Sequence, residues 1–269
     1  MPNIIKTRQE YDAIKDHLNF SGAKKLLVSP AHYQNYLTQP NEQTKALKVG
    51  SLTHAKVLQP EIVDQEFCVS PDIDKRTKEG KMLFEQFLAT AGTKTVVSQD
   101  EWQLTEDVAR TMNQIVNRLG VTFIKTEFMF TTELYGVKFK VAIDALGDDD
   151  FLYDLKTTEA ADPRNFLRSV LNYKYALQAY IYRMAYESAF GSRLKGFRFI
   201  AVEKEPPFAG AIYELGAEVM TSASFDFEKA VKLYKSCTEL GEWPSYPEDV
   251  QVIDLPIKSA SSSTPINFA

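Results

Sequence analysis

The periodicity of the sequence changes near Val121, and this change sets what the chain can fold into. Residues 1–120 carry helix signals with little strand alternation, so this half is predicted to be almost wholly α-helical. Beyond Val121, alternating apolar and polar runs are separated by short polar turns, which is typical of antiparallel strands in a meander. The predicted strands are Phe128–Leu134, Val137–Leu146 and Phe151–Lys156. This pattern predicts an α/β fold whose sheet is built mainly by the second half.

Capping residues and glycines mark the predicted helix ends. Ser21 is the predicted N-cap of a first helix, Ser29 and Pro30 open a second, and Gly191 and Gly241 end two later ones. The other predicted elements are helices at Lys45–Leu58, Arg76–Ala91 and Gln99–Leu119, a helical region opened by Asp162-Pro163 with Tyr173–Phe190 as its strongest part, strands at Gly196–Glu203 and Ala211–Leu215, and a helix at Ser224–Leu240. From the long helical half onward, the predicted order is therefore α, β, β, β, α, β.

The chain has 269 residues, of which 44% are hydrophobic, and this composition supports a folded core. We predict a single domain over residues 1–257, with a helical elaboration over 1–120, an αβ core over 121–257 and a flexible tail over 258–269. No apolar run is long enough to span a membrane and no secretory signal opens the sequence, so a cytoplasmic protein is expected. Cys68 and Cys237 are expected to be free thiols.

The net charge of −5 gives no global basic signal for nucleic acid. A DNA enzyme is not excluded, because it can gather acidic residues at a metal site and confine its basic surface to one groove. The densest basic segment contains Lys75, Arg76, Lys78 and Lys81 ahead of a predicted helix. These residues are suited to holding a phosphate backbone, although a solvated helix terminus explains the same charges.

Two aspartates and a lysine lie on the second and third predicted strands. Side chains alternate along a strand, so Asp154 and Lys156 share one face. If the strands pair across the turn at Gly147–Asp150, Asp144 approaches Asp154, and two close carboxylates repel unless a cation or proton intervenes. Mg²⁺ would relieve this repulsion, with the Leu155 carbonyl as a further ligand. A strand-end aspartate and a surface ion pair are the plain alternative.

Four polar residues elsewhere in the sequence could complete such a site. His54 lies in a mainly apolar helix and could be a third metal ligand, or an ordinary core histidine. Glu127 on the first strand could reach the same cation, or could be an ordinary polar residue of a strand. Gln178 and Tyr182 are four positions apart and so share a helix face, where they could bind phosphate oxygens or belong to aromatic packing.

Longer motifs over most of the chain are more specific. They are Ser29-Pro30-Ala31 with Tyr33; Gly50-Ser51-Leu52-Thr53-His54 continuing to Leu58-Gln59-Pro60; Arg76-Thr77-Lys78 with Gly80-Lys81; Ile143-Asp144; Asp154-Leu155-Lys156-Thr157-Thr158; Tyr175 with Gln178, Tyr180 and Tyr182; and Glu242-Trp243-Pro244. With these motifs the chain resembles, from Phe20 to Tyr246, the RecE-type exodeoxyribonucleases (the exonuclease VIII nuclease domain) of the PD-(D/E)xK nuclease superfamily. The resemblance implies a restriction-endonuclease-like core, with a mixed central sheet and an α-helical N-terminal elaboration.

The resemblance also implies an activity and a set of partners. The implied enzyme is a Mg²⁺-dependent 5′→3′ exonuclease, with Mn²⁺ as a substitute, that digests linear double-stranded DNA and leaves 3′ single-stranded tails for recombination. A phage or prophage setting, a homo-oligomeric ring on DNA ends and a RecT-like single-strand annealing protein as partner are implied likewise.

Position by position, the resemblance assigns roles to the residues singled out above. Asp144 and Asp154 are similar to the metal-binding acids, Lys156 to the catalytic lysine and His54 to the metal-ligand histidine. Glu127 falls where relatives often have a further acid. Gln178 and Tyr182 fit the Gln-x-x-x-Tyr motif of RecB-like nucleases.

The sequence departs from the pattern just before the first catalytic aspartate. Ile143 stands at the proline of the superfamily name, and Ala142 stands where many relatives have arginine. Lys140, two residues earlier on the same strand face, is placed to compensate. Two rival functions are an endonuclease of the same fold, which closed circular DNA would reveal, and a non-catalytic DNA-end binding protein, which would bind without cleavage.

Overall fold

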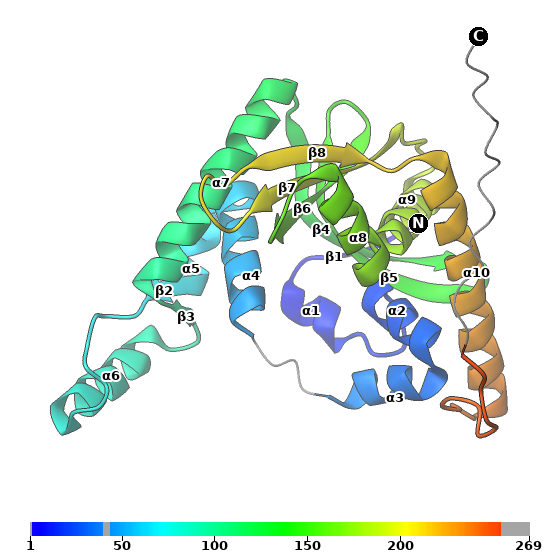
Figure 1. Cartoon of the computed structure of the whole chain (residues 1–269), viewed down its shortest axis with the longest axis horizontal. Coiled ribbons are helices and arrows are strands. Elements are labelled where there is room, and N and C mark those ends of the chain that lie inside the picture. The colour runs from blue at the N-terminus through cyan, green and yellow to red at the C-terminus, as the bar shows by residue number, and fades with distance from the viewer. Residues whose placement is uncertain (1, 40–43, 254–269) are drawn as a thin grey trace, which may run out of the picture.

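The computed structural model of the protein describes residues 2–39 and 44–253 (Figure 1). Its centre is a mixed sheet in which the described strands lie in the order β1-β4-β5-β6-β7-β8. These strands are β1 (Asn3–Ile5), β4 (Phe123–Leu134), β5 (Val137–Gly147), β6 (Phe151–Thr158), β7 (Gly196–Glu203) and β8 (Gly210–Glu214). Neighbouring strands are antiparallel except β6 and β7, which are parallel. The predicted α/β class with a mixed sheet is confirmed, while the predicted tail at 258–269 lies outside the described residues.

The connections between strands explain their directions. β4 and β5 are joined by Tyr135 and Gly136, whose φ angles of 52° and 73° match a two-residue type I′ turn. The turn from β5 to β6 contains Asp150 with a φ of 65°. Both connections are too short for anything but an antiparallel pair. The chain then crosses over through two helices before β7, and such a crossover permits parallel pairing with β6.

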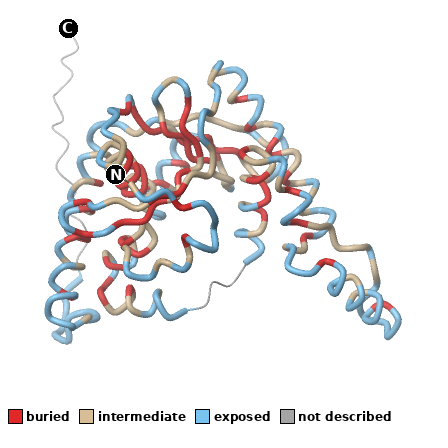
Figure 2. Tube along the Cα trace, turned by 180° about the vertical axis from the view of Figure 1, so that it is seen from behind, coloured by how far each residue is buried: buried red, intermediate tan, exposed pale blue. Residues whose placement is uncertain are grey.

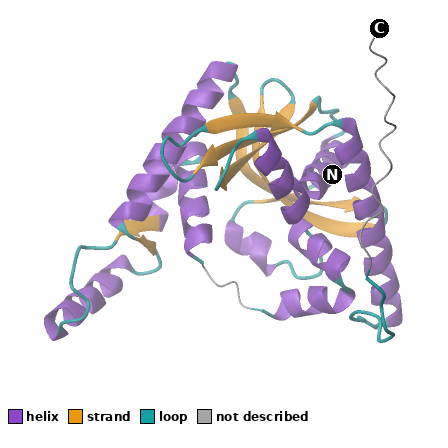
Figure 3. Cartoon of the chain, viewed as in Figure 1, coloured by secondary structure: helices purple, strands orange, loops and turns teal. Residues whose placement is uncertain are grey.

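Helices cover both faces of the sheet (Figures 1 and 3). On one face, α2 (Phe20–Val28), α8 (Pro163–Tyr173), α9 (Tyr175–Phe190) and α10 (Ala217–Leu240) enclose a core that includes Phe139, Phe166 and Phe227. On the other face, α4 (Lys45–Leu58) and α7 (Gln99–Leu119) pack over a second core that includes Val108, Met112 and Tyr153. The smaller described helices are α1 (Arg8–Ala13), α3 (Pro30–Thr38), the 3₁₀ helix η1 (Pro60–Ile62) and α5 (Val63–Glu66).

Strand β6 is buried on both faces because it lies inside the sheet with helices on either side (Figure 2). Leu152 belongs to the core under α9, whereas Tyr153 and Leu155 belong to the core under α4 and α7. On the α9 side, Asp154 and Lys156 stand where the alternation of a buried strand would place apolar residues. Polar residues that break the pattern of a buried strand indicate a functional site.

Most predicted elements of the first half occur, with two corrections. Lys45–Leu58 and Gln99–Leu119 have the predicted bounds, and Ser29 caps the helix that begins at Pro30. The first helix is capped by Asn19, whose side chain accepts the Gly22 N–H at 2.7 Å, so the prediction of Ser21 as N-cap is wrong. The first half is also not almost wholly helical, because it contains β1, β2 (Phe67–Val69) and β3 (Thr95–Val97).

The helical region after the third predicted strand is broken in two. Lys174 has a φ of 59°, in the left-handed region, and so ends α8 and precedes α9. Gly191 and Gly241 end α9 and α10 as predicted, both in the left-handed conformation. The last helix begins at Ala217 rather than at the predicted Ser224, and Gly216 is its N-cap residue.

An arm extends from the body of the molecule (Figure 1). It consists of α6 (Lys78–Ala91) and the parallel pair β2–β3 that carries it. Most residues of α6 are exposed, including Met82, Leu83 and Leu88. None of the described helices combines the length and the apolar character that a membrane crossing needs.

Candidate active site

Helix α4 holds His54 against the edge where β5 and β6 meet. The Nε2 atom of His54 lies 3.0 Å from the carbonyl oxygen of Leu155. A carbonyl can only accept a hydrogen bond, so Nε2 carries the proton and donates it. The other ring nitrogen, Nδ1, faces two carboxylates, at 3.4 Å from Glu127 Oε1 and 3.6 Å from Asp144 Oδ2. The backbone of β6 therefore orients this imidazole so that Nδ1 points at the acids.

Glu127 reaches the group from β4, at the position opposite Asp144. Thr126 lies opposite Ala145 and Phe128 opposite Ile143, so the register between β4 and β5 is continuous here. Glu127, which lies between, has a φ of 43°, an uncommon conformation for a residue with a side chain. Backbone strain of this kind costs about 1–3 kcal/mol and is concentrated at functional sites.

Asp144 joins β5 to β6 through its side chain. The registered pairs of these strands are Ala145 with Tyr153 and Leu146 with Leu152. Beyond the Ala145–Tyr153 pair, the Leu155 N–H of β6 donates to Asp144 Oδ2 of β5 at 2.8 Å. The strand edge thus holds the carboxylate of Asp144 beside the backbone of β6, at the residue that follows Asp154.

Asp154, Lys156 and Gln178 form a second, adjoining group. Asp154 is almost fully buried, and its Oδ2 lies 2.5 Å from the Lys156 Nζ. The Gln178 side chain on α9 connects the two, since its Nε2 donates to Asp154 Oδ1 at 2.7 Å and its Oε1 accepts from Lys156 Nζ at 3.1 Å. The Lys156 Nζ also lies 4.5 Å from the centre of the Tyr175 ring. Gln178 therefore braces the acid and the lysine, a contact that helix spacing alone did not reveal.

The pKa values show that the site carries an excess of negative charge. Burial and then the charge of Asp144 raise the pKa of Asp154 to about 6, although Lys156 acts against them. Burial is also the main reason why the pKa of Asp144 is raised. Burial lowers the pKa of His54, but the Asp144 and Glu127 carboxylates outweigh it and bring the pKa to about 9. Burial also lowers the pKa of Lys156, but the Asp154 and Asp144 carboxylates outweigh it, so the pKa of Lys156 is raised.

The donor set fits a divalent cation. Ligand atoms of His54, Glu127 and Asp144 all lie within 4.8 Å of one another. Asp154, predicted as a metal ligand, is turned toward Gln178 and toward Lys156, whose ammonium group forms an ion pair with its Oδ2. An imidazole nitrogen with several carboxylate oxygens can bind a divalent metal ion, and the raised carboxyl pKa values indicate negative charge that a cation would neutralise.

The other predicted site residues lie apart from this group or deeper in the fold. Tyr182 is buried, and burial raises the pKa of its phenol well above the ordinary value. On the arm, Arg76 donates to both oxygens of Asp74, and the Lys75 Nζ lies 3.6 Å from the centre of the Phe84 ring. The remaining two, Lys78 and Lys81, are exposed at the start of α6.

Lys140 does not reach the site. Its Nζ is buried against α1 and donates to the carbonyl oxygens of Tyr11 and Ile14, at 2.9 Å and 2.6 Å. The expectation that Lys140 compensates for the missing arginine is therefore wrong. Lys24 on α2 is a basic residue that sequence reasoning missed: burial first, then the nearby charges of Lys25 and Lys156, lower its pKa. No local pattern marks Lys24, because its proximity to Lys156 arises from packing of α2 near α9.

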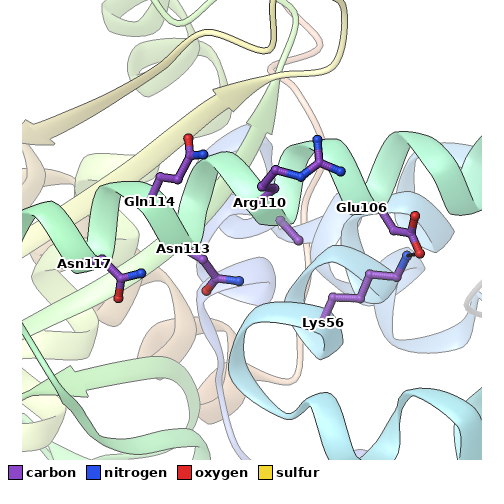
Figure 4. A pocket seen from close by; sticks show the side chains of 7 residues that line it. Lys56, Glu106, Arg110, Asn113, Gln114 and Asn117 are labelled. Carbon is purple, nitrogen blue, oxygen red and sulfur yellow. Dashed lines mark ion pairs between the residues drawn. The ribbon is translucent and has the colours of Figure 1, made fainter.

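An open polar hollow of about 490 Å³ lies along α4 and α7, away from this group (Figure 4). Arg110, Asn113 and Asn117 of α7 line it together with Lys56 of α4. Lys56 follows His54 by two positions, about 200° around the helix, so it points away from the acids. Its Nζ donates to the Trp102 carbonyl oxygen at 3.0 Å. The hollow is thus separate from the candidate active site.

Comparison with known proteins identifies the fold and the family of the chain. A crystal structure from Eubacterium rectale, described as "Putative exonuclease", has a TM-score of 0.67 and 16% sequence identity, over 94% of this chain and 96% of that one. The alkaline exonuclease LHK-Exo from Laribacter hongkongensis has 13% identity over 87% of this chain and 98% of that one, with a TM-score of 0.34 that is too low to support an argument. No curated protein sequence matches the chain.

The first of these likenesses shows a shared fold. The family match extends over residues 19–256 and so includes both strand acids, His54, Lys156 and Gln178. The chain belongs to the family described as "PDDEXK-like domain of unknown function (DUF3799)", and its fold is that of the PD-(D/E)xK nuclease superfamily.

Proposed function

We propose that the protein is a metal-dependent nuclease that hydrolyses phosphodiester bonds of DNA. One observation carries the proposal: His54, Glu127 and Asp144 converge within 4.8 Å beside the buried ion pair of Asp154 and Lys156. The family supports it, because the match over residues 19–256 includes the strands that carry Asp144, Asp154 and Lys156. We assign to these three residues the two acids and the lysine that name the superfamily. A surface ion pair does not account for this group, since Asp154 is 1% exposed and its charge is unfavourable without a further cation.

His54, Glu127 and Asp144 would hold the metal ion, with Asp154 as the next ligand. An ion bound there supplies electrostatic stabilisation of the scissile phosphate and a water of lowered pKa. The Leu155 carbonyl oxygen serves this set chiefly by accepting a hydrogen bond from His54 Nε2–H, which leaves Nδ1 as the nitrogen that would bind the ion. The carboxylate oxygens favour Mg²⁺ or Mn²⁺, and the imidazole nitrogen is a better ligand for Mn²⁺ than for Mg²⁺. The proposed cofactor is Mg²⁺, with Mn²⁺ as a substitute.

Lys156 is the proposed electrostatic catalyst. Its raised pKa keeps the ammonium charged at neutral pH, so it can stabilise the negative charge that develops on a phosphate in the transition state. Gln178 is a positioning residue, because it holds both Lys156 and Asp154 by hydrogen bonds. Tyr175 lies against the same ammonium group and restricts its position.

We further propose 5′→3′ digestion of linear duplex DNA that leaves 3′ single-stranded tails for recombination. Support comes from the motif resemblance to RecE-type enzymes, and from the description of the Eubacterium rectale protein as an exonuclease. The same resemblance supports a ring-shaped homo-oligomer and a RecT-like annealing partner. Sizing the protein in solution tests the ring, and co-purification with the annealing protein tests the partner.

The activity test compares three DNA substrates in Mg²⁺ and in EDTA. Linear duplex labelled at the 5′ end should lose its label before duplex labelled at the 3′ end, and closed circular plasmid should stay intact. Asp144→Asn should abolish digestion, while Asp72→Asn, the same change at an exposed position outside the site, should not. Internal cutting of the plasmid would indicate an endonuclease, and binding without cleavage a DNA-end binding protein. Equal activity of Asp144→Asn and the wild type would refute the site.

A further inference from the structure

A basic pocket lies where α2, the junction of α8 with α9, and α10 meet. Its volume is about 400 Å³, and four lysines line it: Lys24, Lys25, Lys174 and Lys229. Asp226 is the only carboxylate among the lining residues, and it is engaged by Lys174, whose Nζ lies 2.9 Å from its Oδ2. The other three lysines have no acidic partner within this lining. The pocket therefore attracts a polyanion, although the protein as a whole is acidic.

A chain of side-chain contacts connects the candidate active site to the neighbourhood of this pocket. The Lys156 Nζ lies over the ring of Tyr175, and Tyr175 stacks on Tyr173 with ring centres 5.5 Å apart. The residues on either side of Tyr173, Asn172 and Lys174, line the pocket. Two stacked tyrosine rings thus lie between the proposed catalytic lysine and the residues that line the pocket.

Exposed aromatic rings flank these lysines. Tyr173 is 55% exposed, and Phe225, next to Asp226 on α10, is 65% exposed. Both rings thus present an open face to solvent, and bases of unpaired strands stack on such rings.

Lysines that bind phosphates and rings that stack bases are the two components of single-strand recognition. A duplex would use the lysines but would leave the rings without a partner, because its bases are already stacked. An acidic protein segment would likewise leave Tyr173 and Phe225 without a specific role. The combination favours an unpaired nucleic-acid strand over both.

We propose that this pocket binds the unpaired DNA strand that continues from the scissile phosphate, with Lys24, Lys25 and Lys229 on its phosphates and Tyr173 stacked on a base. The proposal rests on the nuclease function proposed above. It states where the unpaired part of the cleaved strand is bound outside the active site. The arm residues Lys75, Arg76, Lys78 and Lys81 are not needed for this contact.

Binding without cleavage tests the proposal independently of catalysis. A fluorescent single-stranded oligonucleotide and a blunt duplex are titrated with the full-length protein in EDTA, and anisotropy is read at several salt concentrations. Lys25→Ala/Lys229→Ala should weaken single-strand binding at least tenfold, and it should lower the slope of log affinity against log salt by about 1.4, since each phosphate contact contributes about 0.7. Tyr173→Ala should weaken single-strand binding by roughly fivefold or more and affect the duplex less.

Lys232→Ala is the matched control, because Lys232 is exposed on the same helix and does not line the pocket. Wild-type affinity of the double variant, or an equal loss in Lys232→Ala, would overturn the proposal. Unchanged binding by Tyr173→Ala would remove base stacking from it, and equal losses for single strand and duplex would assign the pocket to duplex DNA. If the wild type cleaves DNA and the pocket variants bind single-stranded DNA with wild-type affinity, the pocket proposal alone is refuted. If the protein binds single-stranded DNA through the pocket but never cleaves DNA, only the nuclease proposal is refuted.

Discussion

Replacing Asp154 with asparagine should stabilise the metal-free protein, and increasingly so as the pH rises. The folded pKa of about 6, against an ordinary 3.8, means that the protonated form fits the buried site better than the carboxylate. Because the folded pKa is raised, the stability that this group contributes is complete below pH 3.8 and is lost as the pH rises through 6. The ionised carboxylate then costs less than about 1 kcal/mol at pH 4, about 2 kcal/mol at pH 5 and about 3 kcal/mol at pH 8. Asparagine cannot ionise, so Asp154→Asn should gain up to these amounts.

Urea unfolding in EDTA at pH 5 and pH 8 measures this gain. In a thermal melt under the same conditions, a gain of about 3 kcal/mol should raise the melting temperature by several degrees, at roughly 2–4 °C per kcal/mol for a chain of this size. Mg²⁺ should stabilise the wild type more than Asp154→Asn, because a ligand that binds only the folded state raises its stability. Asp72→Asn serves as the control for the change in net charge. If Asp154→Asn is no more stable than the wild type at pH 8, or if the gain does not grow with pH, the excess of negative charge at this site is disproved.

Two further changes test other parts of the site. Gln178→Ala should lower kcat by about 10–100-fold while leaving DNA affinity in EDTA unchanged, because Gln178 holds Asp154 and Lys156 rather than the substrate; a loss of affinity with unchanged kcat would instead make it a DNA contact, as its helix position alone suggested. His54 has a metal-free pKa of about 9, so a proton competes with the metal below that pH. The Mg²⁺ concentration for half-maximal activity should therefore fall by up to tenfold per pH unit between pH 7 and 9, and then level off. His54→Asn should flatten this dependence, and an unchanged dependence would separate His54 from the metal.

Local signals in the sequence predicted the elements that their own residues define. α7 has the predicted bounds because Ser98 and Glu101 form a capping box at its start and Gly120 adopts a left-handed conformation at its end. β4 and β5 follow from strand alternation on either side of a turn that contains Gly136. Strand β1 was missed because its three residues are too few to show a period. It exists only by pairing with β4, far away in sequence.

The candidate site was predictable in its residues and less so in its contacts. Strand spacing placed Asp144 near Asp154, and the structure brings the Asp144 side chain onto the neighbouring Leu155 N–H. The positive φ of Glu127 and the turn of Asp154 toward Lys156 depend on how two strands and α9 pack, so no local pattern encodes them. The basic segment before α6 was the clearest charge signal in the sequence, whereas the lysine pocket joins residues as far apart in the sequence as Lys24 and Lys229.

The central claim is that His54, Glu127, Asp144 and Asp154 form one divalent-metal site. Anomalous diffraction from crystals soaked in Mn²⁺ measures this directly. We predict one strong peak within about 2.0–2.3 Å of Asp144 and Glu127 oxygens and of His54 Nδ1, with the Asp154 carboxylate turned toward it. An absence of any peak at this group, with the four side chains unmoved and His54 Nδ1 still facing bare carboxylates, would contradict the claim.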